Sequence, residues 1–513
     1  MPLPVPKRRL AWTVGGHVKP ICRRGVARTL VAGAGAVALA LVSGVPTLAH
    51  DNDVVKQRST QSGTAAVTSD KVQVLGTFPE LAGISGDYAR STEHFYLSTL
   101  NGITVLDISN PAQPVPLGKY VNSYFENEAM DYGERRTNGQ LTDQFVMIGV
   151  DLQSVDPSDP AHTNIGGGEL IIVDVEDPNN PHARSRVTGT TSTHTVACVR
   201  EVQCRFAYSA GDKGKFSIFD LRDLDNPKEV DSDATTPEID PFDSPAANPN
   251  AVFTRGAGHK WNFDRGARGF HTGSGGTAAF DVSNPLNPRL LTTTGAAGRG
   301  EAAGYEDWNN FIHHNSWHPN EAAFRADAPA RIQNGNVLLV TEEDYEQTDC
   351  AKAGSFQTWK INSFQRPGAI RPLDKVELAD LGGPAEFVLP QGAFCSAHWF
   401  DYHQSGITAV AYYGGGIRLV DVRDPLNISS YGYALGGETW DAYWMPKRRD
   451  NGTAELGRTN ILYGVDLVNG LTVYRVDLPG SSGATSTERA GATQTSALTG
   501  MNHTCGTQMA GAV

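Results

Sequence analysis

The sequence predicts an all-β fold, a β-propeller with seven blades, and two observations support this prediction. A motif of four or five apolar or β-branched residues, closed by a polar residue and a turn, recurs seven times at a mean spacing of about 61 residues. Gly (55 residues) and Pro (29 residues) are abundant in the 513-residue chain, which is typical of a protein rich in turns. Two stacked β-sandwiches would hold as many strands, but they would not explain sevenfold recurrence of one strand-and-turn signature.

Residues 1–49 are predicted to be a signal peptide and are excluded from the fold. This segment has several basic and no acidic residues, and an almost wholly apolar stretch runs from Leu30 to Val45. The stretch is short for a membrane span and normal for the apolar core of a signal. Arg23 and Arg24 resemble a twin-arginine signal, and an ordinary secretory signal is the alternative. We therefore expect a secreted, extracellular protein with no membrane span.

The charge balance excludes nucleic acid as a main partner. The formal net charge is −13, and the mature chain is more acidic still because the leader is purely basic. Nucleic acids and anionic membranes both require clustered Lys and Arg. Hydrophobic residues make up 39% and charged residues 19% of the chain, which is the composition of a globular protein. We expect this globular protein to be a monomer.

Five copies of the repeated motif end in Asp, and this Asp has a predicted structural role. Its carboxylate can accept hydrogen bonds from the backbone of the Asn/Asp-Pro turn that follows, and the strand must stop there because Pro cannot donate to a ladder. The expected turn caps are Asp107, Asp174, Asp220, Asp281 and Asp421. Two degenerate copies carry Lys360 and Arg475 instead, so we expect those two turns to be capped in another way or to be looser.

One copy of the motif, Leu170-Ile-Ile-Val-Asp174, resembles the LVIVD repeat of secreted and cell-surface bacterial β-propeller proteins. The resemblance covers about residues 72–478 and implies the propeller fold. It implies little about function, because the repeated strand is structural. The predicted organisation is a signal peptide (1–49), an N-terminal segment that is either a flexible approach or a partner closing the ring (50–71), the propeller (72–478) and a disordered tail rich in Ser, Thr and Gly (479–513).

The cysteines that follow the leader are predicted to form two disulfides. None has the CxxC spacing of a zinc site or a redox pair, so disulfides in an oxidising compartment fit best. Cys198 and Cys204 lie between two apolar runs, at the neck of a predicted hairpin. Cys350 and Cys395 are then the natural second pair, which leaves Cys505 in the tail.

Four consecutive repeats place a histidine where the innermost strand of the blade is expected to begin. These residues are His194, His259, His314 and His398. Innermost strands face the central channel, so we expect these four rings to point into one channel mouth, and strand alternation sends His313 to the opposite side. The second and seventh repeats offer carboxylates near the same point, Glu128 and Asp441.

Neutral imidazoles with nearby carboxylates are suitable ligands for a divalent transition metal such as Zn, Cu or Fe. The alternative is a structural role, in which the histidine ring packs at the narrow start of the innermost strand and hydrogen-bonds a neighbouring carbonyl. A calcium site at Glu342-Glu343-Asp344 is a further possibility, with a solvated acidic loop as its alternative. Histidines outside the register are expected at the surface: His94, His162, His182, His271, His403 and His503.

Three functions stay open on the sequence alone. The first, which the sequence favours, is a binding or scaffold module for an extracellular protein or glycan. The second is a metal-dependent enzyme, an oxidoreductase or a hydrolase, with the histidines at the propeller axis as its metal site. The third is a purely structural envelope protein. The sequence contains no GxSxG elbow, P-loop or HExxH motif, which argues against several common enzyme classes.

Overall fold

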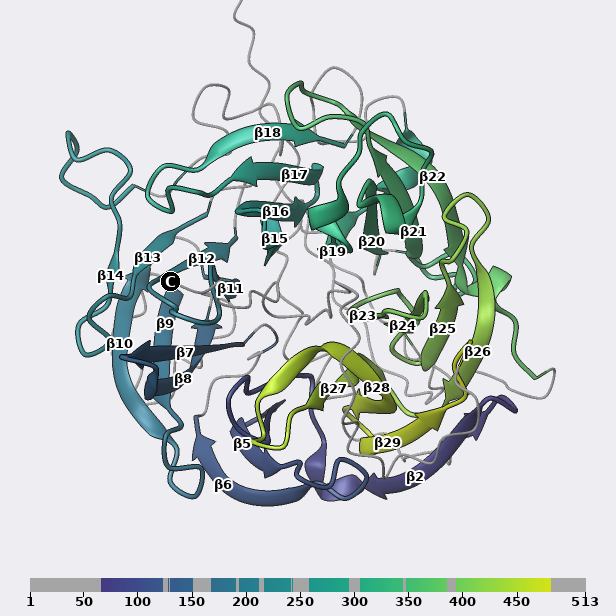
Figure 1. Ribbon diagram of the computed structural model, residues 1–513, viewed down its shortest axis with the longest axis horizontal. Coiled ribbons are helices and arrows are strands. Elements are labelled where there is room, and N and C mark those ends of the chain that lie inside the picture. Colours follow the sequence, from purple (N-terminus) through teal and green to yellow (C-terminus); the bar gives the residue numbers. More distant parts are fainter. Residues whose placement is uncertain are drawn as a thin grey trace, which may run out of the picture. The chain divides into compact units, whose positions relative to one another are not determined.

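Seven antiparallel sheets form the blades of a β-propeller around a common axis (Figure 1), so the predicted fold class is confirmed. This computed structural model describes residues 66–122, 128, 130–150, 168–190, 193–211, 216–240, 242, 258–294, 305–344, 347–384 and 394–480. The chain divides into Met1–Val45, which lies outside the described residues, and Pro46–Val513, which contains the propeller.

The first five blades each contain four strands that are consecutive in the chain, with the innermost strand first. Blade 1 consists of β3 (Ser85–Tyr88), β4 (His94–Thr99), β5 (Gly102–Asp107) and β6 (Val115–Val121). Blade 2 consists of β7 (Asp131–Thr137), β8 (Gln140–Val150), β9 (Gly168–Asp174) and β10 (His182–Thr190). Blade 3 consists of β11 (Thr195–Cys198), β12 (Phe206–Ala210), β13 (Ile218–Asp220) and β14 (Lys228–Glu229).

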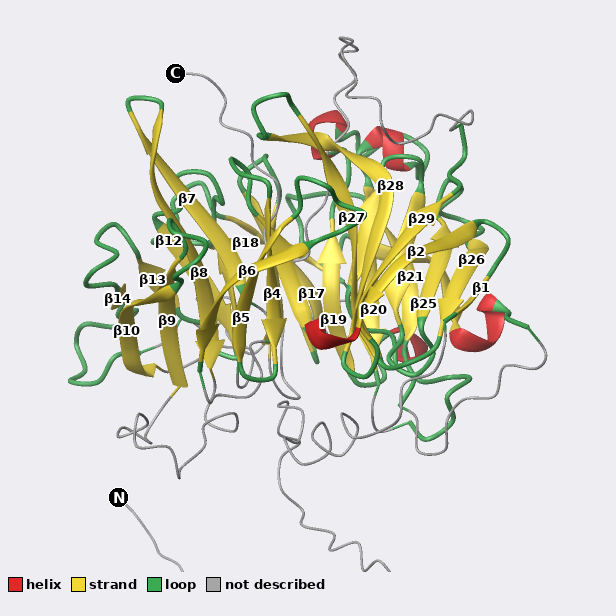
Figure 2. Ribbon diagram, turned by 90° about the horizontal axis from the view of Figure 1, so that it is seen from below, coloured by secondary structure: helices red, strands yellow, loops and turns green. Residues whose placement is uncertain are grey.

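Blade 4 consists of β15 (Gly258–Phe263), β16 (Arg268–Gly273), β17 (Gly276–Asp281) and β18 (Arg289–Thr293). Blade 5 consists of β19 (Ile312–Trp317), β20 (Val337–Glu343), β21 (Ser355–Ile361) and β22 (Ile370–Glu377). Short 3₁₀ helices join some strands: Pro79–Leu81, Glu306–Trp308, Glu321–Ala323, Ile332–Asn334 and Leu378–Leu381. Figure 2 shows that strands dominate the blades, and the described residues include no helix long and apolar enough to cross a membrane.

The last two blades also use strands from the beginning of the described chain. Blade 6 consists of β23 (Phe400–His403), β24 (Ile407–Ala411), β25 (Ile417–Asp421) and β26 (Ser429–Leu435), with β1 (Val67–Thr68) added at its outer edge. Blade 7 consists of β27 (Thr439–Arg448), β28 (Ala454–Asp466), β29 (Gly470–Val476) and, outermost, β2 (Val72–Phe78). The ring is therefore closed by pairing of the first strands with the last blades.

The third strand of most blades is the repeated motif, and its closing Asp caps the following turn. In five blades a carboxylate oxygen of this Asp accepts a hydrogen bond of 2.8–3.0 Å from the backbone N–H two residues further on. These residues are the predicted caps Asp107, Asp174, Asp220, Asp281 and Asp421. In blade 5, where Lys360 replaces the Asp, the hydroxyl of Ser363 accepts a similar bond from the backbone N–H of Gln365 at 2.9 Å.

We expect Asp174→Ala to lower the free energy of unfolding by about 1 kcal/mol, because the backbone N–H of Glu176 loses its acceptor. Asp174→Asn is the matched control, since its side-chain oxygen can accept the same bond. Chemical denaturation of the three proteins measures the effect. Equal destabilisation by Ala and Asn would show that the turn does not depend on this hydrogen bond.

Adjacent blades are joined by apolar packing and by buried carboxylates on the innermost strands. One core cluster, for example, joins Tyr208 of blade 3 to Trp261 and Phe263 of blade 4. Asp87 accepts a hydrogen bond from the backbone N–H of Tyr132 in the next blade at 3.0 Å. Asp131 and Asp401 make the same kind of bond to the following blade, at 2.6 Å to Cys198 and 2.9 Å to Trp444. These bonds satisfy the buried backbone groups and hold the innermost strands in place around the axis.

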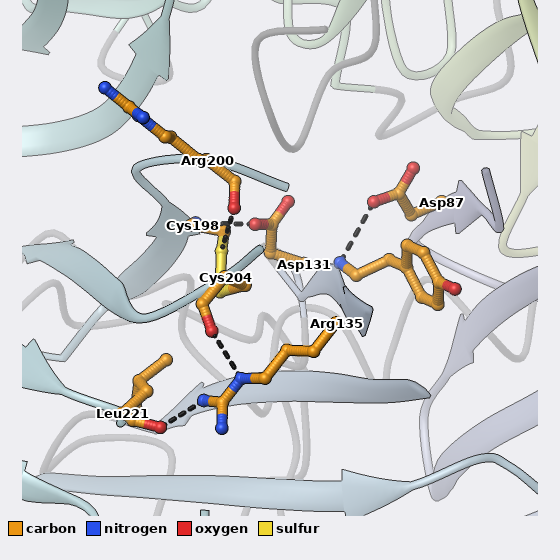
Figure 3. Close-up of a disulfide and its surroundings, with 8 residues drawn as sticks. Asp87, Asp131, Arg135, Cys198, Arg200, Cys204 and Leu221 are labelled. Atoms are coloured by element: carbon orange, nitrogen blue, oxygen red, sulfur yellow. Dashed lines mark hydrogen bonds between the residues drawn. A yellow bond between two sulfur atoms is a disulfide. The ribbon is translucent and has the colours of Figure 1, made fainter. Parts of the chain in front are cut away.

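Two disulfides join the cysteine pairs expected from the sequence. Cys198 and Cys204 are bonded across the loop between β11 and β12, with their Cα atoms 5.9 Å apart. Figure 3 shows this disulfide with Asp131 and Arg135 of blade 2. The guanidinium of Arg135 donates a hydrogen bond of 2.8 Å to the carbonyl oxygen of Cys204. Cys350 of blade 5 is bonded to Cys395, which precedes blade 6. Cys505 lies outside the described residues.

Candidate metal centre

A cluster of histidine and glutamate side chains lies near the propeller axis, on the side where the innermost strands begin. His259 is on β15 and His314 is on β19. Three other residues stand just before innermost strands: Glu128 before β7, His194 before β11 and His398 before β23. These side chains come together because the innermost strands surround the axis (Figure 1). All five residues are at most 5% exposed.

Glu128 is the carboxylate that lies closest to the histidine rings. Its Oε1 is 2.9 Å from Nε2 of His398 and 3.3 Å from Nε2 of His314. Glu343, the last residue of β20, approaches the same nitrogen of His314, with Oε2 3.8 Å from Nε2. Nε2 of His194 lies 3.4 Å from Nε2 of His259, so the fourth histidine contacts the cluster through His259.

The tautomers of two rings can be deduced from their partners. Nδ1 of His398 lies 2.6 Å from the carbonyl oxygen of Trp440, and Nδ1 of His259 lies 3.2 Å from the carbonyl oxygen of His314. A carbonyl oxygen can only accept, so a neutral ring in this position carries its proton on Nδ1 and presents a lone pair on Nε2. This is the usual arrangement of a metal-binding histidine, in which the second ring nitrogen is held by a backbone carbonyl.

Burial keeps the rings of His259 and His314 neutral. Burial lowers the pKa of His314 to about 4, and the neighbouring ring of His398 acts in the same direction. Burial likewise holds the pKa of His259 well below its usual value, with the rings of His314 and His194 contributing. At neutral pH both rings therefore need no proton to be removed before they ligate a metal.

Aromatic side chains enclose the histidines. The ring centroid of Trp399 lies 4.5 Å from that of His314, and that of Tyr413 lies 4.5 Å from that of His398. The Tyr413 hydroxyl also donates a hydrogen bond of 2.7 Å to Oε1 of Glu343. Tyr413 thus orients the second carboxylate, and the apolar rings exclude water, which strengthens electrostatic interactions within the cluster.

The structure places Asp441 differently from the other candidate ligands. Two aspartates, Asp131 and Asp401, each lie three residues after a candidate ligand, Glu128 and His398 respectively. Asp441 is the equivalent aspartate of blade 7, so the residue at the ligand position of that blade is Glu438. The Asp441 carboxylate accepts hydrogen bonds from the hydroxyl of Tyr443 and the backbone N–H of Ala442. Burial raises the pKa of Asp441 well above its usual value, and its carboxylate does not belong to the donors that surround His314.

Glu343 lies at the axis, although its sequence position indicated only a possible calcium site. Strand β20 runs antiparallel to β19 and brings Glu343 opposite Ile312, beside the histidines. Its neighbour Glu342 instead accepts hydrogen bonds from Ser355 and Gln357, at 2.7 and 3.2 Å. The two neighbouring carboxylates therefore differ: that of Glu342 bonds side chains of its own sheet, and that of Glu343 faces the histidine cluster. The hairpin register is the signal that would have found Glu343.

The expectation for histidines outside the register was partly wrong. His271 is fully buried against Trp261, with ring centroids 4.5 Å apart, and His403 is 5% exposed. His182 is exposed, as expected, and His94 is half-buried. His162 and His503 lie outside the described residues. His313, on the opposite side of β19 from its neighbour, bonds Thr277 and the carbonyl of Trp308, each at 2.9 Å.

Fold and site together define a seven-bladed β-propeller with histidine and glutamate side chains clustered at its axis. Residues 83–122, which include blade 1, match the model of the LVIVD repeat. This match agrees with the resemblance of the sequence motif to the LVIVD repeat.

No curated protein matches the sequence. Among solved structures, the chain is similar to the β-propeller domain of Cps50 (Swd1) from Myceliophteria thermophila, with 10% identity over 79% of this chain and 100% of that chain and a TM-score of 0.46. It is also similar to a chain of the Mitotic Checkpoint Complex (9% identity, 82% and 95% covered, TM-score 0.42). A third similar structure is the WD40 β-propeller domain of Doa1 (8% identity, 80% and 97% covered, TM-score 0.43).

Proposed function

We propose that this protein is an exported metal-binding β-propeller, in which the axial cluster holds a divalent transition metal. The observation that carries the proposal is the convergence of Nε2 atoms and carboxylate oxygens from blades 2, 5 and 6, with N–O distances of 2.9 to 3.8 Å. Two of the rings are oriented through Nδ1 by backbone carbonyls, which a ligand requires. The residues that would hold the ion are Glu128, His259, His314, Glu343 and His398.

The donor set favours Zn, Cu or Fe over Ca or Mg, because imidazole nitrogen is the main ligand. A bound ion of this kind would supply Lewis acidity or electron transfer, which are the chemistries of a hydrolase or an oxidoreductase. The chain itself orients the ligands through Tyr413 and the backbone carbonyls and excludes water with Trp399. Such a centre supports the enzyme alternative over a purely structural role for the histidines.

The β-propeller with its LVIVD repeat remains the framework of a binding or scaffold module. An extracellular protein or glycan is the partner class that the predicted leader suggests, and the two disulfides are consistent with an extracellular location. The metal centre and a binding face are compatible, since propeller surface loops are free to bind while the axis holds the ion.

Metal titration of the dialysed protein tests the proposal. With Zn²⁺ or Cu²⁺ at 100 times its dissociation constant, we expect the folded state to gain about 2.7 kcal/mol of stability. His398→Ala should lower metal affinity by at least about 100-fold, because it removes a ligand. His182→Ala is the matched control, since His182 is exposed and outside the cluster. A wild-type protein that retains no metal and is not stabilised by Zn²⁺, Cu²⁺ or Fe²⁺ would make the histidines structural.

Tyr413→Phe should weaken metal binding by about 10-fold while leaving the fold intact, because Glu343 loses the donor that orients it. Tyr412→Phe is the matched control. Tyr412 is equally buried, but its hydroxyl points to the carbonyl oxygen of Val376 at 3.5 Å, away from Glu343. Isothermal titration with Zn²⁺ measures both affinities. Identical affinities for the two variants would remove Tyr413 from the site.

A further inference from the structure

The possible metal ligands at the axis fall into two groups of three that share one residue. The first group contains Glu128, His259 and His314, and the second contains His314, Glu343 and His398. Within each group, one ligand atom per residue lies within 4.8 Å of the others, and all five residues are buried. His194 extends the first group, because its Nε2 lies 3.4 Å from that of His259.

A single ion fits this arrangement poorly. Zinc–ligand bonds are about 2.0–2.2 Å long for nitrogen and oxygen, so two donors on opposite sides of one ion lie no more than about 4.4 Å apart. The donors of one ion should therefore form one group rather than two. Moreover, zinc is usually satisfied by four ligands, and with His194 the cluster contains six candidate residues.

His314 and Glu128 are placed to serve both groups. Neither ring nitrogen of His314 makes a well-aligned hydrogen bond within the described part of the chain, unlike Nδ1 of His259 and of His398. A neutral imidazole has one lone pair, so the neutral His314 ring can ligate one of two ions and would join both only as an imidazolate. Glu128 belongs to the first group, yet its Oε1 is only 2.9 Å from Nε2 of His398 in the second. A carboxylate has two oxygens and can bind one ion with each.

We propose that the axis holds two transition-metal ions side by side, with His314 and Glu128 at their boundary. One ion is held on the side of His259 and His194, and the other on the side of Glu343 and His398. This inference rests on the proposed function and adds to it a stoichiometry and a class of chemistry. Paired ions can clamp a small substrate from two sides, as in two-metal hydrolysis, or exchange electrons as a coupled pair.

Copper loading of the full-length mature protein tests the inference through metal content and electron paramagnetic resonance. We expect two Cu²⁺ per chain after removal of excess metal, and a resonance signal that integrates to less than the copper present, because adjacent ions couple. His259→Ala and Glu343→Gln should each bind one Cu²⁺, whose signal integrates to all of the copper. His314→Ala should lower the content below that of either variant.

Each other outcome has a definite meaning. One Cu²⁺ per wild-type chain at saturation would overturn the two-ion inference and leave the proposed metal site intact. Two ions that persist in both His259→Ala and Glu343→Gln would also overturn it, because at least one ion would then bind elsewhere. Absence of any bound ion would contradict the proposed function itself. His182→Ala, changed at an exposed histidine, should match the wild type in content and signal.

Discussion

Removal of strand β2, residues 72–78, is expected to open the ring and abolish cooperative folding of the propeller. β2 is the outermost strand of blade 7 and pairs with β29, from Val72 opposite Val476 to Phe78 opposite Leu471. Val72 is 6% exposed, and Leu75 and Phe78 pack against the core between blades 7 and 1. Full burial of a side chain of this kind contributes about 1.5–3 kcal/mol, and Leu75 and Phe78 are only partly buried. Their combined loss is on the order of 5 kcal/mol, within the range of the total stability of many domains.

Denaturation of the deletion variant, followed by both fluorescence and circular dichroism, measures this effect. Val74→Thr is the matched control, because Val74 lies on the same strand but is 39% exposed. The control should unfold like the wild type, whereas the deletion variant should show a lower midpoint and a broad transition. A deletion variant with an unchanged, cooperative transition would show that β2 is dispensable and that ring closure lies elsewhere.

His271→Phe should make the protein less sensitive to acid by about 2 kcal/mol between pH 7 and pH 5. Burial lowers the pKa of His271 to about 3 in the folded protein, whereas an unfolded histidine titrates near about 6.5. As the pH falls below about 6.5, the unfolded chain binds a proton that the folded chain excludes, so the wild type loses stability. Phenylalanine keeps a ring against Trp261 and removes this titration.

Urea denaturation of both proteins at the two pH values gives the difference in unfolding free energy. Only its change with pH is informative, because exchanging one ring for another also shifts stability by an amount that does not depend on pH. His182→Phe serves as the control, since it makes the same exchange at an exposed position. A stability difference between wild type and His271→Phe that is the same at pH 7 and pH 5 would contradict the buried, neutral state of His271.

Much of the fold could be predicted because its determinants are local and repeated. Asp174 and its counterparts cap turns through bonds to residues two positions away, and such short-range patterns are visible in a sequence. Closure of the ring by β2 could not be predicted, because it depends on pairing between residues about 400 positions apart. No local pattern distinguishes a closing strand from an ordinary outer strand.

The candidate site, like the fold, could be predicted only in part. His259, His314 and His398 were placed together because equivalent points of adjacent innermost strands meet at the axis. Glu343 was not placed with these histidines, because its position depends on the register of the β19–β20 hairpin. This hairpin includes a bulge between His313 and Asn315. The burial of His271 depends on packing against blade 3, where Phe216 lies 5.6 Å from its ring. Contacts of this kind between blades leave no periodic trace in the sequence.

Crystals of the mature protein grown with Zn²⁺ or Cu²⁺ test for a metal centre at the propeller axis, through anomalous scattering at the absorption edge of the metal. We expect anomalous density about 2.0–2.2 Å from an imidazole nitrogen of His314, with Glu128 and His398 or His259 completing the coordination. Anomalous density only at surface residues, with Glu128 still in direct contact with His398, would contradict a metal centre at the propeller axis.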